Sequence, residues 1–162
     1  MAEKIDYDKT HRQNLSVVAV HIDKIFKEAA QEAAKIGVSL HKTLPDGKIF
    51  SFADYPETKK QIDRLIEDLK QNLTTITVNG IRSAWTLSNN KNNALSRRIF
   101  GDNVGKLSQI QYRRYFTNNA QALDAFIARK TNGLNLSDRV WKYTDEFKHE
   151  IELGLDIGIR NG

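Results

Sequence analysis

Long stretches of helical periodicity with few breaks are the feature that most constrains the fold of this chain. Apolar residues recur three or four positions apart from about Asp8 to Ile36, again after Pro56, and a third time after Asn135. That spacing places them along one face of an α-helix. Only two prolines interrupt the 162 residues, and proline is the residue that helices tolerate least. The sequence therefore predicts an all-α protein, a bundle of about five or six helices of which two are long.

One segment breaks the helical pattern. Residues 44–48 read Leu-Pro-Asp-Gly-Lys, the composition of a tight turn, because proline presets φ and glycine accepts the left-handed region. Short alternating arms flank this turn, so we expect a small β-hairpin near residues 38–52. Gly37 is expected to end the first helix before the hairpin. A phosphate-binding loop is not indicated, since the other glycines and the following Ser or Thr of such loops are missing.

The second long helix is expected to begin at Pro56 and to end or bend at the polar residues 88–93. The β-branched residues 74–78 lower helix propensity, but the helical period continues through them, so we expect them to be helical. Three shorter helices are predicted after the polar run, the first of them closed by Gly101: residues 94–100, 104–116 and 120–130.

The last stretch, residues 131–162, begins as a well-marked helix. Asn135 is a suitable N-cap, with Asp138 three residues on. Acidic residues crowd the first half of the polar face, as the helix dipole favours. The periodic stretch then reaches Gly162 without a following tail. We therefore expect residues 1–162 to form a single helical domain that is the N-terminal part of a longer protein.

Little in the sequence indicates catalysis. Cysteine is absent, which removes disulfides, thiolate nucleophiles and cysteine metal ligands. Glu146 and His149 form an i, i+3 pair, but this is half of a di-iron motif whose second half is missing. The serines lack a nucleophile elbow, and no apolar run reaches the roughly 18 residues of a membrane span. We expect no enzyme activity, no cofactor, no metal and no membrane partner.

Positive charge is concentrated in the middle of the chain. Residues 81–135 hold nine Lys and Arg against two Asp and Glu, whereas residues 1–80 are neutral and residues 136–162 carry four against six. The candidate surface consists of five arginines: Arg82, Arg97, Arg98, Arg113 and Arg114. Five aromatic residues are interleaved with them: Trp85, Phe100, Tyr112, Tyr115 and Phe116.

Basic and aromatic residues together are open to two interpretations. They can bind phosphates and stack nucleic-acid bases. Alternatively, the aromatic residues belong to the core and the arginines face solvent or a protein partner, since arginine with aromatics is also typical of protein–protein hot spots. Helical spacing accounts well for the aromatic residues, so we favour the second interpretation and keep DNA binding by residues 81–135 as the alternative.

Three stretches in order carry a family resemblance. They are residues 50–56 (FSFADYP), residues 80–95 (GIRSAWTLSNNKNNAL), and residues 133–142 (GLNLSDRVWK) with the later segments EIEL and GIRNG. Together they resemble minor head proteins of tailed phages, the head morphogenesis family related to the F protein of phage Mu. The motif positions with an expected structural role are Trp85, Asn89, Lys91, Asn92, Asp138, Arg139 and Trp141. Both tryptophans are expected to be half-buried.

The resemblance implies a noncatalytic structural protein of a phage or prophage head. Such a protein would act with the portal in capsid assembly and DNA packaging, and would be found in the virion and in the cytoplasm of the bacterial host. Its implied partners are portal or capsid subunits, and copies of it could associate on assembly. The alternative remains a helical nucleic-acid-binding protein that uses the basic segment 81–135.

Overall fold

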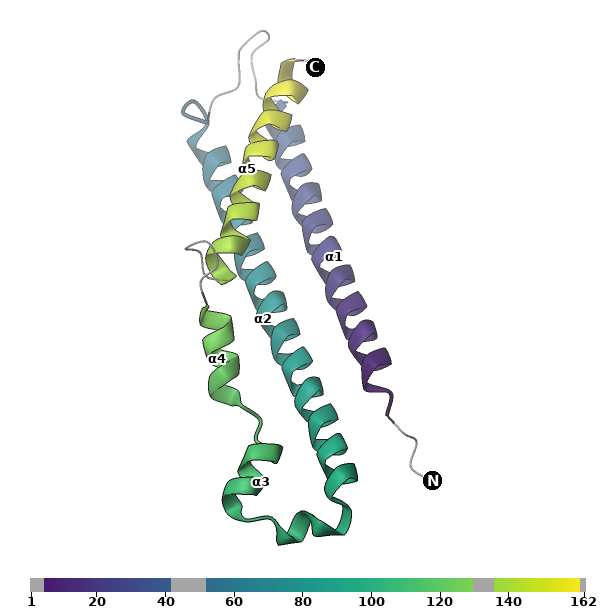
Figure 1. The fold of residues 1–162 in the computed structure, drawn as a ribbon. Helices are drawn as coiled ribbons and strands as arrows, with labels where there is room; N and C mark the ends of the chain where they lie inside the picture. Colours follow the sequence, from purple (N-terminus) through teal and green to yellow (C-terminus); the bar gives the residue numbers. More distant parts are fainter. Residues whose placement is uncertain (1–4, 42–51, 130–135, 161–162) are drawn as a thin grey trace. The chain divides into compact units, whose positions relative to one another are not determined.

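The computed structural model describes residues 5–41, 52–129 and 136–160, and within these ranges it contains five α-helices, one 3₁₀ helix and no strand (Figure 1). The elements in chain order are α1 (Tyr7–His41), α2 (Pro56–Phe100), η1 (Gly101–Lys106), α3 (Gln109–Phe116), α4 (Ala120–Ala128) and α5 (Leu136–Arg160). The all-α prediction is confirmed. Three helices rather than two are long, at 35, 45 and 25 residues.

The chain forms two compact units. Unit 1 comprises Met1–Ala19 with Thr77–Arg129, and unit 2 comprises Val20–Ile76 with Lys130–Gly162. Both α1 and α2 contribute to each unit. The expectation of a single domain over residues 1–162 stays a prediction.

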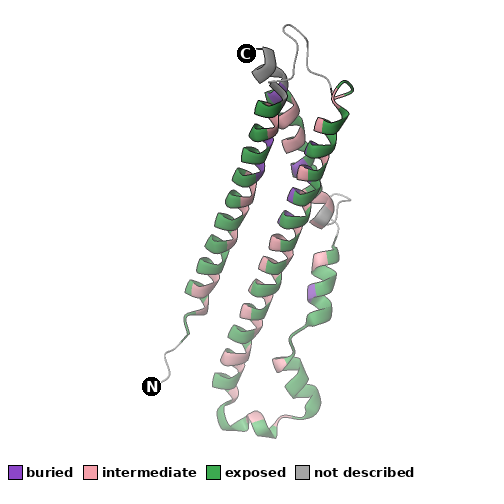
Figure 2. Ribbon diagram, turned by 180° about the vertical axis from the view of Figure 1, so that it is seen from behind, coloured by how far each residue is buried: buried purple, intermediate pink, exposed green. Residues whose placement is uncertain are grey.

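Unit 2 has a packed core between α1, α2 and α5. Its centre is a row of α2 side chains at heptad spacing, all 5% exposed or less: Ile62, Ile66, Leu69 and Leu73. From the other helices, Ala29 joins this cluster, and the rings of Phe26 and Phe147 meet edge to face at 5.5 Å. Figure 2 shows the buried residues on these facing helix surfaces. Three long helices thus enclose one apolar seam.

Unit 1 buries far less. Among its described residues only Leu123 of α4 is buried. The start of α1 approaches α2 closely at Gly80, where an added Cβ would lie 3.2 Å from Val18 Cγ2. The short helix α3 packs on the end of α2 through the rings of Phe100 and Tyr115, 4.9 Å apart. Unit 1 is therefore held together by contacts between partly exposed side chains.

The predicted first arm of the hairpin is wrong. Val38 and Leu40 lie in α1, which continues through Gly37 to His41. The reason is close packing at Gly37: a Cβ there would come within 2.8 Å of Leu155 Cδ2. The missing side chain lets α5 approach α1, and the glycine does not end the helix. Residues 42–51 of the expected hairpin lie outside the described residues, and residues 52–54 form a turn.

The predicted break in α2 at residues 88–93 is also wrong. The helix begins at Pro56, as expected, includes residues 74–78, and continues to Phe100. Polar residues can end a helix when their side chains bind their own backbone. Here Asn89 and Lys91 instead bind Asn118 and Asp8 on other segments. The end at Phe100 is confirmed, and Gly101 takes a positive φ of 49°.

The predicted helix over residues 104–116 is shorter than expected. Its first part belongs to the 3₁₀ helix η1, and α3 begins only after Ser108. Ser108 and Gln111 form a capping box, in which each side chain accepts a hydrogen bond from the other residue's backbone N–H, at 3.3 and 2.9 Å. The predicted connection at residues 117–119 is confirmed. The expected cap at Asn135 lies outside the described residues.

Candidate functional site

Unit 1 carries an excess of positive charge. Its described residues include ten Lys and Arg against four Asp and Glu, whereas those of unit 2 include eleven against fourteen. Two of the four acidic side chains in unit 1 are in ion pairs, Asp8 with Lys91 at 2.7 Å and Asp124 with Arg82 at 3.5 Å. Most of the described cations in unit 1 therefore form no ion pair with a described carboxylate.

The five predicted arginines divide into two groups. Arg82 pairs with Asp124, and the guanidinium of Arg97 lies 5.3 Å from the ring centroid of Phe116. Arg98, Arg113 and Arg114 are exposed and make no ion pair with any described residue. The second group is available to a ligand or partner, while the first helps to hold α2, α3 and α4 together.

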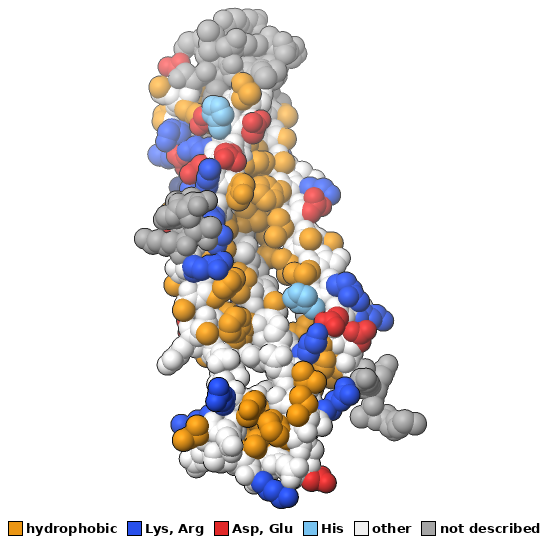
Figure 3. Space-filling view, in the orientation of Figure 1, with side chains coloured by type: hydrophobic (Ala, Val, Ile, Leu, Met, Phe, Trp, Pro, Cys, Tyr) orange, Lys and Arg blue, Asp and Glu red, His pale blue; other side chains and the backbone are white. Residues whose placement is uncertain are grey.

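The aromatic residues of the basic segment contact one another. Tyr112 and Phe116 stack at 4.7 Å, and Phe100 meets Tyr115. Phe100 and Phe116 are half-buried, while the two tyrosines are 42% and 44% exposed. Base stacking needs a free ring face, and in unit 1 these contacts already occupy part of the ring surfaces. Figure 3 shows Lys and Arg beside hydrophobic side chains over α3 and the end of α2.

Two residues of the 80–95 motif fix the connection between α3 and α4. Trp85 Nε1 and Asn89 Nδ2 both donate hydrogen bonds to the backbone carbonyl oxygen of Asn118, at 3.0 and 2.8 Å. The two donors lie one turn apart on α2 and are half-buried. A carbonyl oxygen has two lone pairs and can accept both bonds. The motif residues therefore act as positioning groups for a turn.

Lys91 and Asn92 of the same motif have different surroundings. Lys91 reaches across to α1, and its hydrogen bond to Asp8, followed by the charge of Lys91, holds the pKa of that carboxyl below its usual value. Asn92 is exposed on the outer face of α2. In this motif, Lys91 joins two helices and Asn92 contributes to the surface.

The motif residues of α5 lie in unit 2. Asp138 and Arg139 are half-buried. Trp141 is 43% exposed, which is more than Trp85, and Trp85 is half-buried as expected. The Trp141 ring instead lies on the surface, 5.0 Å from the ammonium group of Lys70. A cation over an aromatic face is stabilising without full burial.

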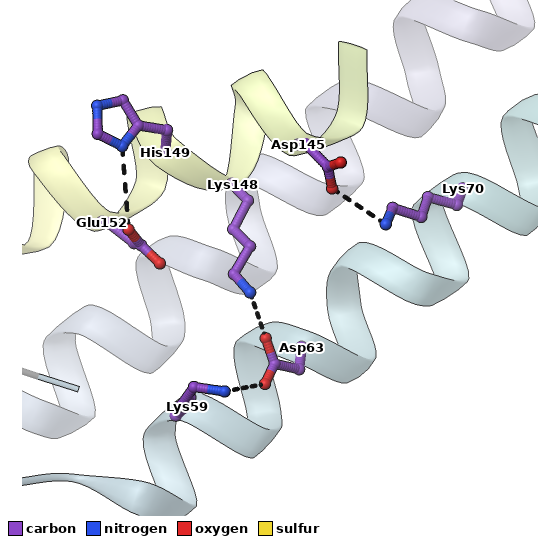
Figure 4. Close-up of polar contacts among 7 residues, drawn as sticks. All are labelled: Lys59, Asp63, Lys70, Asp145, Lys148, His149 and Glu152. Carbon is purple, nitrogen blue, oxygen red and sulfur yellow. Dashed lines mark hydrogen bonds and ion pairs between the residues drawn. The ribbon is translucent and has the colours of Figure 1, made fainter. Parts of the chain in front are cut away.

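Salt bridges join α5 to α2 in unit 2 (Figure 4). Asp63 accepts hydrogen bonds from Lys148 at 2.5 Å and from Lys59 at 2.8 Å, and Lys70 lies 3.0 Å from Asp145. The bond from Lys148, and then that from Lys59, lower the pKa of Asp63. These contacts orient α5 on the core.

The structure offers no support for a metal at Glu146 and His149. His149 Nδ1 instead lies 4.0 Å from a carboxylate oxygen of Glu152 (Figure 4). Within the described ranges no group of three or more His, Asp or Glu side chains is arranged to hold a metal ion. No helix of this part of the chain is long and apolar enough to cross a membrane.

The sequence reasoning missed three exposed aliphatic residues near the arginines. Leu95, Ile99 and Ile110 are 52%, 71% and 81% exposed. The sequence does place them near arginines or a helix start. Leu95 lies three residues before Arg98 and Ile99 directly after it, while Ile110 lies at the start of α3. Large exposed aliphatics beside cations are typical of a surface that binds protein.

An open groove lies between the start of α1 and α2 in unit 1. Its side chains are a mixture of apolar and polar groups: Ile5, Tyr7, Thr10, Leu87, Asn90, Asn93, Ala94 and Arg97. The amides and the guanidinium can donate hydrogen bonds, but they do not change their protonation state near neutral pH. The groove is therefore better suited to binding a polar segment of a partner protein than to acid–base catalysis.

Compared with known proteins, the chain matches no family model, no curated protein and no solved structure.

Proposed function

We propose that the chain is a noncatalytic structural protein of a phage or prophage head, which acts with the portal in capsid assembly and DNA packaging. The resemblance of residues 50–56, 80–95 and 133–162 to minor head proteins motivates the proposal. The observation that carries it is the shared bond acceptor of Trp85 and Asn89, the carbonyl of Asn118. These two bonds give residues 80–95, the second of the three resembling stretches, a role in positioning the connection between α3 and α4.

The surface that these motif residues support is suited to protein contact. α2 continues beyond Trp85 and Asn89 to present Leu95, Arg98 and Ile99 to solvent. Exposed aliphatic side chains gain free energy when a partner removes them from water. An unpaired guanidinium beside them can form bidentate bonds to a partner's carboxylate. We assign portal or capsid subunits as the partner class.

The proposal is tested by binding to the portal protein of the same genome. We expect the purified protein to co-sediment with portal or capsid subunits, and to be found in purified particles by mass spectrometry. Arg98→Glu combined with Ile99→Ser should weaken this binding by about tenfold or more. Arg64→Glu, an exposed charge reversal on the part of α2 in unit 2, is the matched control and should bind like the parent. Absence from particles together with no binding to either subunit would contradict the proposal.

DNA binding is the second candidate, and one specific observation favours it. Arg98, Arg113 and Arg114 make no ion pair with any residue in the part of unit 1 that the structure describes. Contacts of such residues with phosphates give an affinity that falls steeply with salt. Fluorescence anisotropy with duplex DNA at low and high salt would measure it. Binding that is lost on charge reversal of all three arginines, without any portal binding, would favour this candidate over the first.

A further inference from the structure

The outer face of α2 in unit 1 is an exposed strip of defined length. We call it the basic α2 face: Ser88, Asn92, Leu95, Arg98 and Ile99. All five residues are exposed, with Leu95 at 52% and Ile99 at 71%. From Ser88 to Ile99 the strip covers three helical turns, about 16 Å. Neighbouring faces of α2 are occupied by Trp85 and Asn89, which bind Asn118, and by the groove beside α1.

A second exposed strip of the same length lies on α5 in unit 2. We call it the acidic α5 face: Tyr143, Glu146, Glu150 and Leu153. Tyr143 is 65% exposed and Leu153 is 48% exposed. These four residues recur at i, i+3, i+7 and i+10, so they follow one side of the helix over about 15 Å. The adjacent side of α5, next to Tyr143, packs on the core of unit 2 through Val140, Phe147 and Ile151.

The two faces are complementary in charge and in apolar content. Each carries two large exposed side chains, Leu95 and Ile99 on α2, Tyr143 and Leu153 on α5. Glu146 and Glu150 make no hydrogen bond or ion pair with any residue that the structure describes, and the same is true of Arg98. Among described residues, unit 1 has more cations than anions and unit 2 has more anions than cations. Complementary charge favours encounter and fixes register.

We propose that the basic α2 face of one copy of this chain binds the acidic α5 face of a second copy. Arg98 would pair with Glu146 or Glu150, Asn92 would donate a hydrogen bond to the other carboxylate, and the four apolar side chains would be removed from water. The contact joins two different surfaces, so it is heterologous. A bound pair keeps one unused face of each kind, one on each copy, so the association continues into a closed ring or an open chain. This inference does not depend on portal binding, because it concerns the protein alone.

Sedimentation velocity of the purified protein from micromolar to millimolar concentration tests the proposal. We expect the sedimentation coefficient to rise with concentration, and to rise less at high salt, which screens exposed charges. Arg98→Glu alone, and Glu146→Arg with Glu150→Arg together, should each lower the association constant by about tenfold or more. An equimolar mixture of the two variants should recover association, because each then offers the charge that the other lacks.

Two control variants carry charge reversals of the same sign elsewhere, on unit 2. Arg64→Glu and Asp68→Arg alter exposed residues of α2 outside both faces, and they should associate like the parent. A sedimentation coefficient that does not change with concentration would overturn the proposal, as would equal losses in the control variants. Failure of the mixture to recover, combined with DNA binding that Arg98→Glu abolishes, would assign the basic α2 face to nucleic acid. Portal binding is measured in a separate experiment. Glu146→Arg with Glu150→Arg distinguishes the two proposals, because it alters self-association without changing the α2 residues assigned to the portal contact.

Discussion

The same helix behaves differently in the two units. On α2, Ile62 in unit 2 is fully buried, whereas Ile99 in unit 1 is 71% exposed. Both belong to helical apolar patterns that look alike in the sequence. The difference arises from the neighbouring elements. In unit 2, the 25 residues of α5 pack along α2 together with α1. In unit 1, α2 has beside it the start of α1 and two helices of only eight and nine residues. An apolar pattern therefore indicates a helix, but only the partner elements decide whether its face becomes core or surface.

The ion pairs of the two units also differ in how far they are exposed to solvent. Asp63 in unit 2 is held by two lysines, and its side chain is 38% exposed. Asp8 in unit 1 forms an ion pair with one described lysine, Lys91, and its side chain is 67% exposed. Exposed pairs contribute little because water and salt screen them. We conclude that unit 2 supplies most of the stability, while unit 1 leaves more of its large side chains exposed.

The largest expected effect comes from truncation at the centre of the unit 2 core. Ile62→Ala should lower the free energy of unfolding by about 2–5 kcal/mol, because it removes buried methyl groups and leaves a cavity. Ile99→Ala, the matched change in unit 1, should cost about 0.5 kcal/mol or less. Urea unfolding followed by circular dichroism measures both. Equal costs for the two variants would remove the contrast between the units.

A smaller effect is expected at the turn in unit 1. Trp85→Phe removes the hydrogen bond to Asn118 but keeps a ring, and Asn89 still satisfies the carbonyl. It should cost about 0.5–1.5 kcal/mol. Trp141→Phe is the control, since the indole N–H of Trp141 makes no hydrogen bond within the described part of the chain. Thermal unfolding of both variants tests whether this hydrogen bond stabilises the turn. A larger loss of stability for Trp141→Phe than for Trp85→Phe would contradict that role of Trp85.

Two glycines in unit 2 differ in how closely another helix packs on them. Gly154→Ala should raise stability by about 0.5–1 kcal/mol, because alanine favours the helix and a Cβ there meets no atom within 4 Å. Gly37→Ala should gain less, since Leu155 must move from the 2.8 Å contact. Melting temperatures of the two variants give the comparison. A greater gain at Gly37 would contradict the close approach of α1 and α5.

The smallest expected effect is the loss of stability at low pH when Asp63 is protonated. The pKa of Asp63 is lowered by its bonds from Lys148 and Lys59, so its contribution to stability is present above its ordinary pKa of 3.8 and is lost as pH falls through the lowered value. With solvent screening the contribution is about 0.5 kcal/mol. Asp63→Asn should therefore lower the free energy of unfolding at neutral pH. Its free energy of unfolding should also fall less between neutral pH and pH 3 than that of the parent. Unfolding curves at neutral pH and near pH 3 test this, and an unchanged acid slope in the variant would contradict it.

Helix class and several boundaries could be predicted from periodicity and local signals. Pro56 begins α2 because its fixed φ suits a first turn, and Gly101 follows its end with a positive φ. The extent of α1 could not be predicted, because Gly37 stays helical through a contact with Leu155, over a hundred residues away. The same holds for residues 88–93, whose side chains bind partners on distant segments. Local rules fail where tertiary contacts use the residues that would otherwise end a helix.

The candidate site was predictable in part. The excess of charge in residues 81–135 and the arginines were visible in the sequence, but their division into paired and unpaired groups depends on Asp124 and Phe116, which only folding brings near. The spacing of Leu95 and Ile99 is that of any amphipathic helix and does not distinguish an exposed face from a buried one. Their exposure follows from the shortness of α3 and α4, and this could not be read from α2 alone.

Hydrogen exchange of the backbone amides, followed by mass spectrometry, tests the central contrast most directly. If unit 2 supplies the stability, amides of residues 62–73 and 140–155 should exchange slowest and open only with global unfolding, while those of residues 109–128 should exchange by local opening. Peptides from both units are compared in one experiment on the unmodified protein. Equal protection of the two units, or slower exchange in unit 1, would contradict the account.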